Sequence, residues 1–233
     1  GGTQRPFTIT PPQGEAFAMI LEHNGEVLRI NQGPPDSEGR PEGFTLCRKC
    51  HAWLIGDNAP ERHVYTTQKK GDCPRHAGPH DLAQGLWLTS AIRSDLALFD
   101  VPLPERVPSD QANNFYITLT HTLLRALMVT FNLDERELNG FLAPVPEDTT
   151  TPALVRHRIV LYETTAGGSG VLASLHEPGR LAATIARARE LLHEGDPEGR
   201  CERACYACLL SFYNQRHHAF LDRTLVLPWL QGL

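Results

Sequence analysis

The sequence predicts an α+β fold, with α/β as the alternative, and two observations lead to this prediction. Short apolar segments separated by Gly and Pro dominate residues 1–108, which is typical of strands. Residues 109–233 instead hold two segments of helical periodicity on either side of one strand-like segment. We therefore expect a β-rich N-terminal lobe and a C-terminal lobe, with a domain boundary between residues 108 and 109.

In the N-terminal part, a hairpin is expected over residues 16–31. Its centre is Asn24-Gly25, the pair that a type I′ turn prefers because both of its central residues need positive φ. The Gly/Pro-rich residues 32–43 predict a surface loop. Residues 86–103 predict one or two strands, which a proline-rich segment then ends.

A long helix is expected from Asn114 onward. Its apolar residues recur at spacings that place them on one helical face, namely Ile117, Leu124, Met128 and Phe131. His121 completes this face, and we interpret it as a hydrogen-bonded core histidine rather than a metal ligand.

A strand at residues 158–164 is followed by a glycine-rich loop at 165–170 and by a helix at 181–195, with Gly195 as its expected stop. Phosphate-binding loops are built in this order. However, the loop has neither the GKT or GKS ending of a P-loop nor the GxGxxG order of a dinucleotide site. We favour the interpretation that the glycines allow a tight turn and close packing of the helix.

Composition indicates a folded protein in the cytoplasm. The chain has 233 residues, of which 41% are hydrophobic, so it can bury a substantial core. It contains no apolar run of the roughly 20 residues that a membrane span needs, and no export signal. It opens with Gly1 instead of Met, which suggests a piece of a longer protein. The net charge of -5 means that any affinity for DNA must come from a local basic patch.

The cysteines predict zinc sites. All six lie in two tight clusters, each with a CxxC pair and nearby histidines, a pattern that favours metal over disulfides in a chain without an export signal. The first cluster is Cys47-x2-Cys50 and, 22 residues later, Cys73-x2-His76. Thiolates and imidazoles bind zinc tetrahedrally, so these residues predict a closed structural site. The alternatives to His76 as fourth ligand are His51 and His80.

The second cluster is Cys201, Cys205 and Cys208, spaced CxxxCxxC. A fourth ligand is not evident from spacing. A thiolate-rich site leaves zinc a poor Lewis acid, so we expect the metal to stabilise the fold rather than to catalyse hydrolysis. The candidates for the fourth ligand are His193 and Asp196 upstream, and His217 and His218 downstream.

Basic side chains surround the second cluster, and Phe212 and Tyr213 are interleaved with them. Guanidinium groups for phosphates and rings for bases suit a surface that contacts single-stranded nucleic acid, although both aromatic residues fit a core as well. The candidate nucleic-acid-binding residues are Arg203, Arg216, His217, His218 and Arg223.

The segments LYETTAGGSGVL and CERACYACLLSFYNQRHHAFLDR, with the Arg-rich helix between them, resemble a known family. It is the MrfA-type zinc-binding C-terminal domain of DEAD/DEAH-box helicases, and the DISARM components DrmA and DrmB are similar. The resemblance covers about residues 115–225, and CRKC looks like the segment that commonly precedes this domain.

The resemblance implies zinc as cofactor, DNA as partner, and metal-ligand positions at Cys201, Cys205 and Cys208. The family often has another cysteine two residues before the first of these, where this chain has Gly199. Glu163 stands where the family more often has Asp.

What the resemblance implies is an accessory domain of a superfamily 2 DNA helicase or translocase, active in DNA repair or anti-phage defence. The domain would stabilise the C-terminal region and contact single-stranded DNA, and the motor would lie in the parent protein or in a helicase partner. With neither a Walker nor a nuclease motif, the chain itself is not expected to be an enzyme. The alternative is a module that docks a helicase to another protein without touching DNA, which its acidic balance fits. A hydrolase pair of His217 or His218 with Asp222 is a third, weaker hypothesis.

Overall fold

The computed structural model divides the chain into two compact units. The first consists of Gly1–Val27 and Ile92–Leu233, and the second of Leu28–Ala91. The second unit is thus an insertion in the first, and the expected boundary between residues 108 and 109 lies inside the first unit. The described residues are 3–54, 81–145, 157–165, 167–195, 199 and 201–233.

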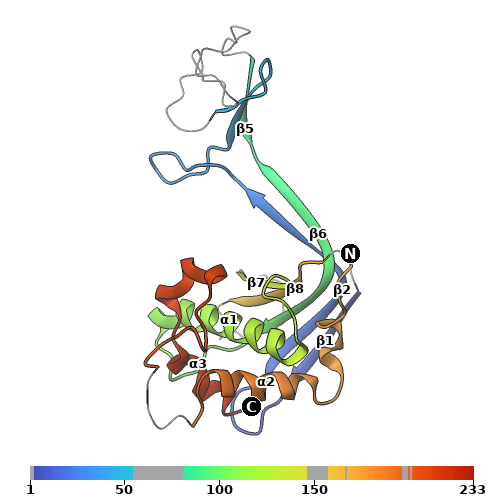
Figure 1. The fold of residues 1–233 in the computed structure, drawn as a ribbon, viewed down its shortest axis with the longest axis vertical. Helices are drawn as coiled ribbons and strands as arrows, with labels where there is room; N and C mark the ends of the chain where they lie inside the picture. Colours follow the sequence, from blue (N-terminus) through green and yellow to red (C-terminus); the bar gives the residue numbers. More distant parts are fainter. Residues whose placement is uncertain (1–2, 55–80, 146–156, 166, 196–198, 200) are drawn as a thin grey trace. The chain divides into compact units, whose positions relative to one another are not determined.

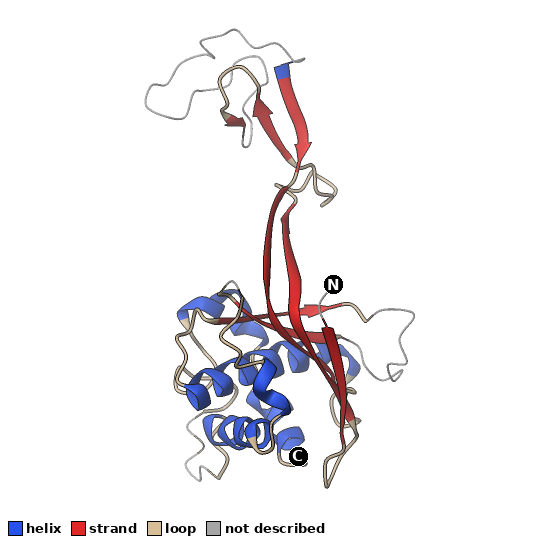
Figure 2. Ribbon diagram, turned by 90° about the vertical axis from the view of Figure 1, so that its right-hand side faces the viewer, coloured by secondary structure: helices blue, strands red, loops and turns tan. Residues whose placement is uncertain are grey.

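The first unit is built on a five-stranded sheet with the order β1-β2-β6-β8-β7. The pairs β1–β2, β6–β8 and β7–β8 are antiparallel. Helices cover one face of this sheet (Figure 2), which confirms the predicted α+β class. The strands are β1 (Thr3–Ile9), β2 (Phe17–Asn31), β6 (Leu88–Asp100), β7 (Leu138–Ala143) and β8 (Arg158–Glu163).

Helix α1 (Ala112–Phe131) organises the core of the first unit (Figure 1). It contacts the sheet and both other α-helices. Its deepest side chains, Phe115, Leu119 and Leu127, are almost fully buried, while most of the predicted stripe packs at the margin of this core. None of the helices in the described part of the chain has the length and apolar character of a membrane span. The other helices are α2 (Arg180–Leu191), α3 (Arg223–Leu230) and the 3₁₀ helices η2 (Ser109–Gln111), η3 (Ala173–His176) and η4 (Phe212–Phe220).

The hairpin predicted at residues 16–31 is wrong, because β2 runs through Asn24-Gly25 as one strand. Asn24 does adopt a positive φ of 54°, but its amide donates to the buried carboxylate of Asp95. Gly25 packs against Leu96 so closely that a Cβ there would lie 2.5 Å from a methyl carbon. Pairing with strands on both sides therefore outweighs the local turn preference, and Asn-Gly forms an irregularity within the strand.

The second unit contains a three-stranded antiparallel sheet with the order β4-β3-β5. Cys47 and Leu82 form its small described core, against which Cys50 and Leu54 pack. Residues 32–43 lie outside the named strands, as the predicted loop requires. The strands are β3 (Phe44–Cys47), β4 (Trp53–Leu54) and β5 (Leu82–Leu86).

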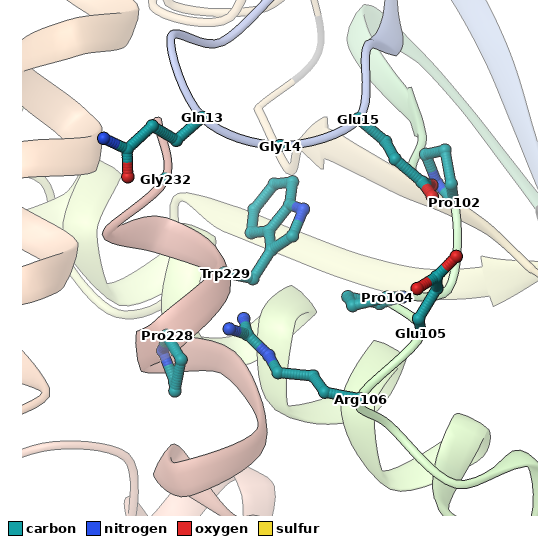
Figure 3. Close-up of a pocket in the computed structure, with 10 residues that line it drawn as sticks. All are labelled: Gln13, Gly14, Glu15, Pro102, Pro104, Glu105, Arg106, Pro228, Trp229 and Gly232. Atoms are coloured by element: carbon teal, nitrogen blue, oxygen red, sulfur yellow. The ribbon is translucent and has the colours of Figure 1, made fainter.

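Helix α3 is fixed at its C-terminal end by the loop that follows β1. The Gln13 amide donates to the carbonyl of Gly232 at 3.1 Å. The Trp229 ring packs against Phe17 and Phe115, with centroid distances of 5.5 and 6.3 Å, and it borders a pocket of about 280 Å³ (Figure 3). This anchoring matters for the site below, because the first residue of α3 reaches the second cysteine cluster.

Candidate metal centre

Four donor atoms converge in the first unit, from His193, Cys201, Cys205 and Cys208, all within 4.8 Å of one another. The sulfur of Cys208 lies 3.7 Å from that of Cys201 and 3.5 Å from that of Cys205. A tetrahedral zinc with Zn–S bonds of about 2.3 Å separates its sulfurs by about 3.8 Å. The spacing therefore fits a shared ion, and it is far too long for a disulfide of about 2.05 Å.

His193 reaches this cluster because of how α2 ends. The helix stops at Leu191, and His193 takes the left-handed conformation with φ of 60°. Glycine usually fills such a position, since a side chain is strained there. The Nε2 atom of His193 lies 3.2 Å from the sulfur of Cys205. His193 therefore has a backbone conformation that suits glycine while its ring lies beside Cys205, which indicates that the ring has a role.

The three thiols differ in their tendency to ionise. Burial raises the pKa of Cys208 to about 12 and also raises the pKa of Cys201. Burial raises the pKa of Cys205 too, but hydrogen bonds from His193 and from Cys208 outweigh it and bring the value to about 6. One thiolate therefore forms readily, whereas the other two need a bound cation to compensate their charge.

Arg223, predicted to bind nucleic acid, holds the two halves of this cluster together. Its guanidinium donates to the carbonyl of Cys201 at 2.7 Å and to the carbonyl of Leu192 at 3.0 Å. One side chain thus fixes both the first cysteine and the residue before His193. Arg203 forms an exposed ion pair with Asp222 at 2.9 Å, a type of contact that contributes little to stability.

His217 and His218 lie apart from the cysteines in the described structure. Nδ1 of His217 is 2.7 Å from Nε2 of His121, so His121 is the hydrogen-bonded histidine that its apolar face predicts. Nε2 of His218 lies 3.0 Å from the carbonyl oxygen of Ser211. Of the four candidates for the fourth ligand, His193 is the one that joins the cluster, and Asp196 lies outside the described residues.

Only half of the first predicted zinc site lies within the described residues. Cys47 is buried at the end of β3, and its carbonyl accepts the amide of His51 at 2.8 Å, closing a tight turn that contains Cys50. Cys73, His76 and His80 lie outside the described residues. The complete four-ligand set therefore remains a prediction.

The glycine-rich loop binds a carboxylate of the protein itself. Glu163 is fully buried, and it accepts the amides of Ser169, of Gly170 at 3.1 Å and of Leu172 at 2.8 Å. Its carboxylate fills the place that a phosphate takes in nucleotide-binding loops. The loop thus joins β8 to the chain that leads to α2. The sequence carried a signal for this, since an acidic residue ends the strand four positions before the first glycine.

Comparison with known proteins finds a match for part of this chain. Residues 119–209 match the family model of the MrfA Zn-binding domain. This confirms the resemblance, and together with the Cys3His cluster it confirms zinc as the expected cofactor.

A solved structure described as DUF1998 helicase MrfA bound to DNA shares the fold, with a TM-score of 0.51 and 10% identity. The match covers 100% of this chain and 25% of that one, so the chain spans about a quarter of the length of the helicase. The comparison with curated proteins gives no match.

The ligand assignment predicts a specific pattern of zinc loss. His193→Ala and Cys208→Ser should each remove one zinc ion and lower soluble yield and thermal stability together, because a structural zinc contributes on the order of 10 kcal/mol. His217→Ala and His218→Ala are the matched controls and should keep full zinc content. Elemental analysis of the purified variants measures this. Zinc loss with unchanged thermal stability would contradict a structural role.

The buried carboxylate of Glu163 predicts that its replacement by an amide lowers the stability of the fold. Glu163→Gln should lower the free energy of unfolding by about 2–4 kcal/mol, because an NH₂ group then faces amide donors in a buried site. The exposed Glu177→Gln is the control and should stay within about 0.5 kcal/mol of wild type. Urea unfolding compares the two, and equal stabilities would show that the loop does not depend on its carboxylate.

The buried His121–His217 pair predicts that the stability of the fold decreases in acid. Burial, followed by the charges of His217, Arg216 and His218, lowers the pKa of His121 to about 4. The unfolded chain, with an ordinary histidine pKa of about 6.5, takes up this proton first, so stability falls as pH drops from about 6.5 towards 4. The stability difference between wild type and His121→Gln should therefore shrink over this range. A constant difference in urea unfolding would exclude the linkage.

Proposed function

We propose that this chain is a zinc-binding accessory domain of a superfamily 2 DNA helicase or translocase. The observation that carries the proposal is the tetrahedral spacing of four zinc-type donors within the segment that matches the MrfA Zn-binding domain. The shared fold with a DNA-bound helicase supports it. The motor would then belong to a parent protein or to a helicase partner, with a role in DNA repair or anti-phage defence in the cytoplasm.

In this proposal zinc acts as a cross-link. His193, Cys201, Cys205 and Cys208 would hold one ion, and the first cluster, with Cys47 and Cys50 on one arm and Cys73 and His76 on the other, would hold a second. Four protein donors leave a tetrahedral zinc no open position for substrate, which is typical of structural sites. The ion would therefore keep the chain between α2 and η4 in one conformation.

Contact with single-stranded DNA is the second part of the proposal. Residues 206–221 contain no Asp, Glu or Lys, and Arg216 is exposed among them. This stretch therefore carries the positive charge of Arg216, with His217 and His218 beside it, in a chain whose net charge is -5. Arg203 forms an ion pair with Asp222, and the guanidinium of Arg223 donates to two backbone carbonyls. We therefore expect Arg216 to contribute most to phosphate binding.

This ranking of the arginines is testable by salt dependence. Arg216→Ala should weaken binding to single-stranded DNA and reduce the slope of log affinity against log salt by about 0.7, the value for one phosphate contact. Arg187→Ala on α2, whose partner is Glu190, is the surface control and should leave the slope unchanged. Arg223→Ala should lower zinc content instead. Fluorescence polarisation over a salt series measures the slopes.

An unaltered slope in Arg216→Ala would remove this residue from the DNA surface. If the wild-type chain fails to bind single-stranded DNA even at low salt, the DNA-contact proposal falls, and docking to a protein partner becomes the better explanation of the domain.

A further inference from the structure

Three large aromatic side chains are exposed in and directly after the candidate metal centre, one of them between Cys205 and Cys208. Tyr206 is 67% exposed, Phe212 75% and Tyr213 59%. Burying such rings is among the largest gains available to a folding chain, so the exposure of three rings within eight residues needs an explanation. Clustered exposed rings typically mark a binding surface.

The backbone that carries these rings is held firmly. The hydroxyl of Ser211 accepts the amide of Tyr213 at 3.1 Å, and the side chain of Asn214 accepts the amide of Ser211 at 2.9 Å, forming a capping box at the start of η4. Asn214 also donates to the carbonyl of Leu209 at 2.8 Å. The rings therefore need little additional ordering when a partner arrives, which favours binding.

A further series of contacts connects the three rings. Arg125 on α1 donates to the carbonyl of Tyr206 at 3.1 Å, and the Tyr206 ring meets His218 edge to face at 6.1 Å. His218 in turn bonds to the carbonyl of Ser211, directly before Phe212. Phe212 and Tyr213 meet at a centroid distance of 5.7 Å. The patch thus combines ring faces with basic groups and has no carboxylate in its own stretch.

We propose that Tyr206, Phe212 and Tyr213 form a stacking platform for unpaired bases of single-stranded nucleic acid. This inference rests on the proposed contact with DNA and adds that bases, besides phosphates, are bound. The charge of the patch fits a polyanion, and its rings fit ligands with flat π faces. A duplex hides its base faces in the stack and offers phosphates and base edges, so single strands are the partner that uses both features.

The experiment compares an oligothymidylate with an abasic oligonucleotide of the same length, which keeps the phosphates and lacks the bases. The zinc-loaded chain should bind the oligothymidylate at least about tenfold more tightly, since stacking contributes about 1–3 kcal/mol per base. The variant Phe212→Leu/Tyr213→Leu keeps apolar side chains but removes two of the three rings, and it should lose most of this preference. Phe141→Leu, at an exposed ring on β7, is the matched control and should keep the preference.

Each outcome separates the two proposals. Equal wild-type affinity for both probes, or a preference that is undiminished in Phe212→Leu/Tyr213→Leu, overturns the stacking platform and leaves phosphate contact standing. Failure to bind either probe overturns the DNA contact itself. If the rings instead support self-association, gel filtration will show wild-type dimers that dissociate in the variant, and the platform is again overturned. Unchanged zinc content in the variant excludes unfolding as the cause.

Discussion

Four donor atoms meet between the end of α2 and the turn before η4, and the geometry of the surrounding chain depends on their being held together. Three sulfurs packed this closely repel one another once ionised, and burial opposes ionisation of Cys201 and Cys208. A divalent cation reverses this balance, because it turns the repulsion among the thiolates into attraction to a common centre. Arg223 supports the same arrangement through backbone carbonyls, and α3 is itself anchored by Trp229.

The glycine-rich loop also balances buried charge, but here backbone amides surround an anionic side chain. Its amides form a concentration of partial positive charge, which Glu163 neutralises from the end of β8. Burying a carboxylate is costly unless several donors satisfy it, and this loop supplies them. The first unit therefore contains one site whose thiols are suited to surround a cation and another whose amides surround an anion. Both lie at ends of secondary structure, where unpaired backbone groups are available.

The elements with strong local signals could be predicted from the sequence. Periodicity predicted α1 and α2, and the strand-like segment before the glycine-rich loop predicted β8. Cysteine spacing identified three donors, but it could not select His193, because its approach depends on a left-handed residue at the end of α2. The hairpin at Asn24-Gly25 failed because strand pairing across the sheet overrode a local preference. The insertion was missed because its two ends are distant in sequence.

That insertion has an evolutionary consequence. β2 and β6 are neighbours in the five-stranded sheet, yet residues 28–91 separate the parts of them that belong to the first unit. The chain thus leaves the sheet and re-enters it beside the point of departure. Such an arrangement lets a gene lengthen, replace or delete the intervening piece while the parental sheet keeps its order, since a short connection suffices to join adjacent strands. The second unit is accordingly a place where related proteins can diversify.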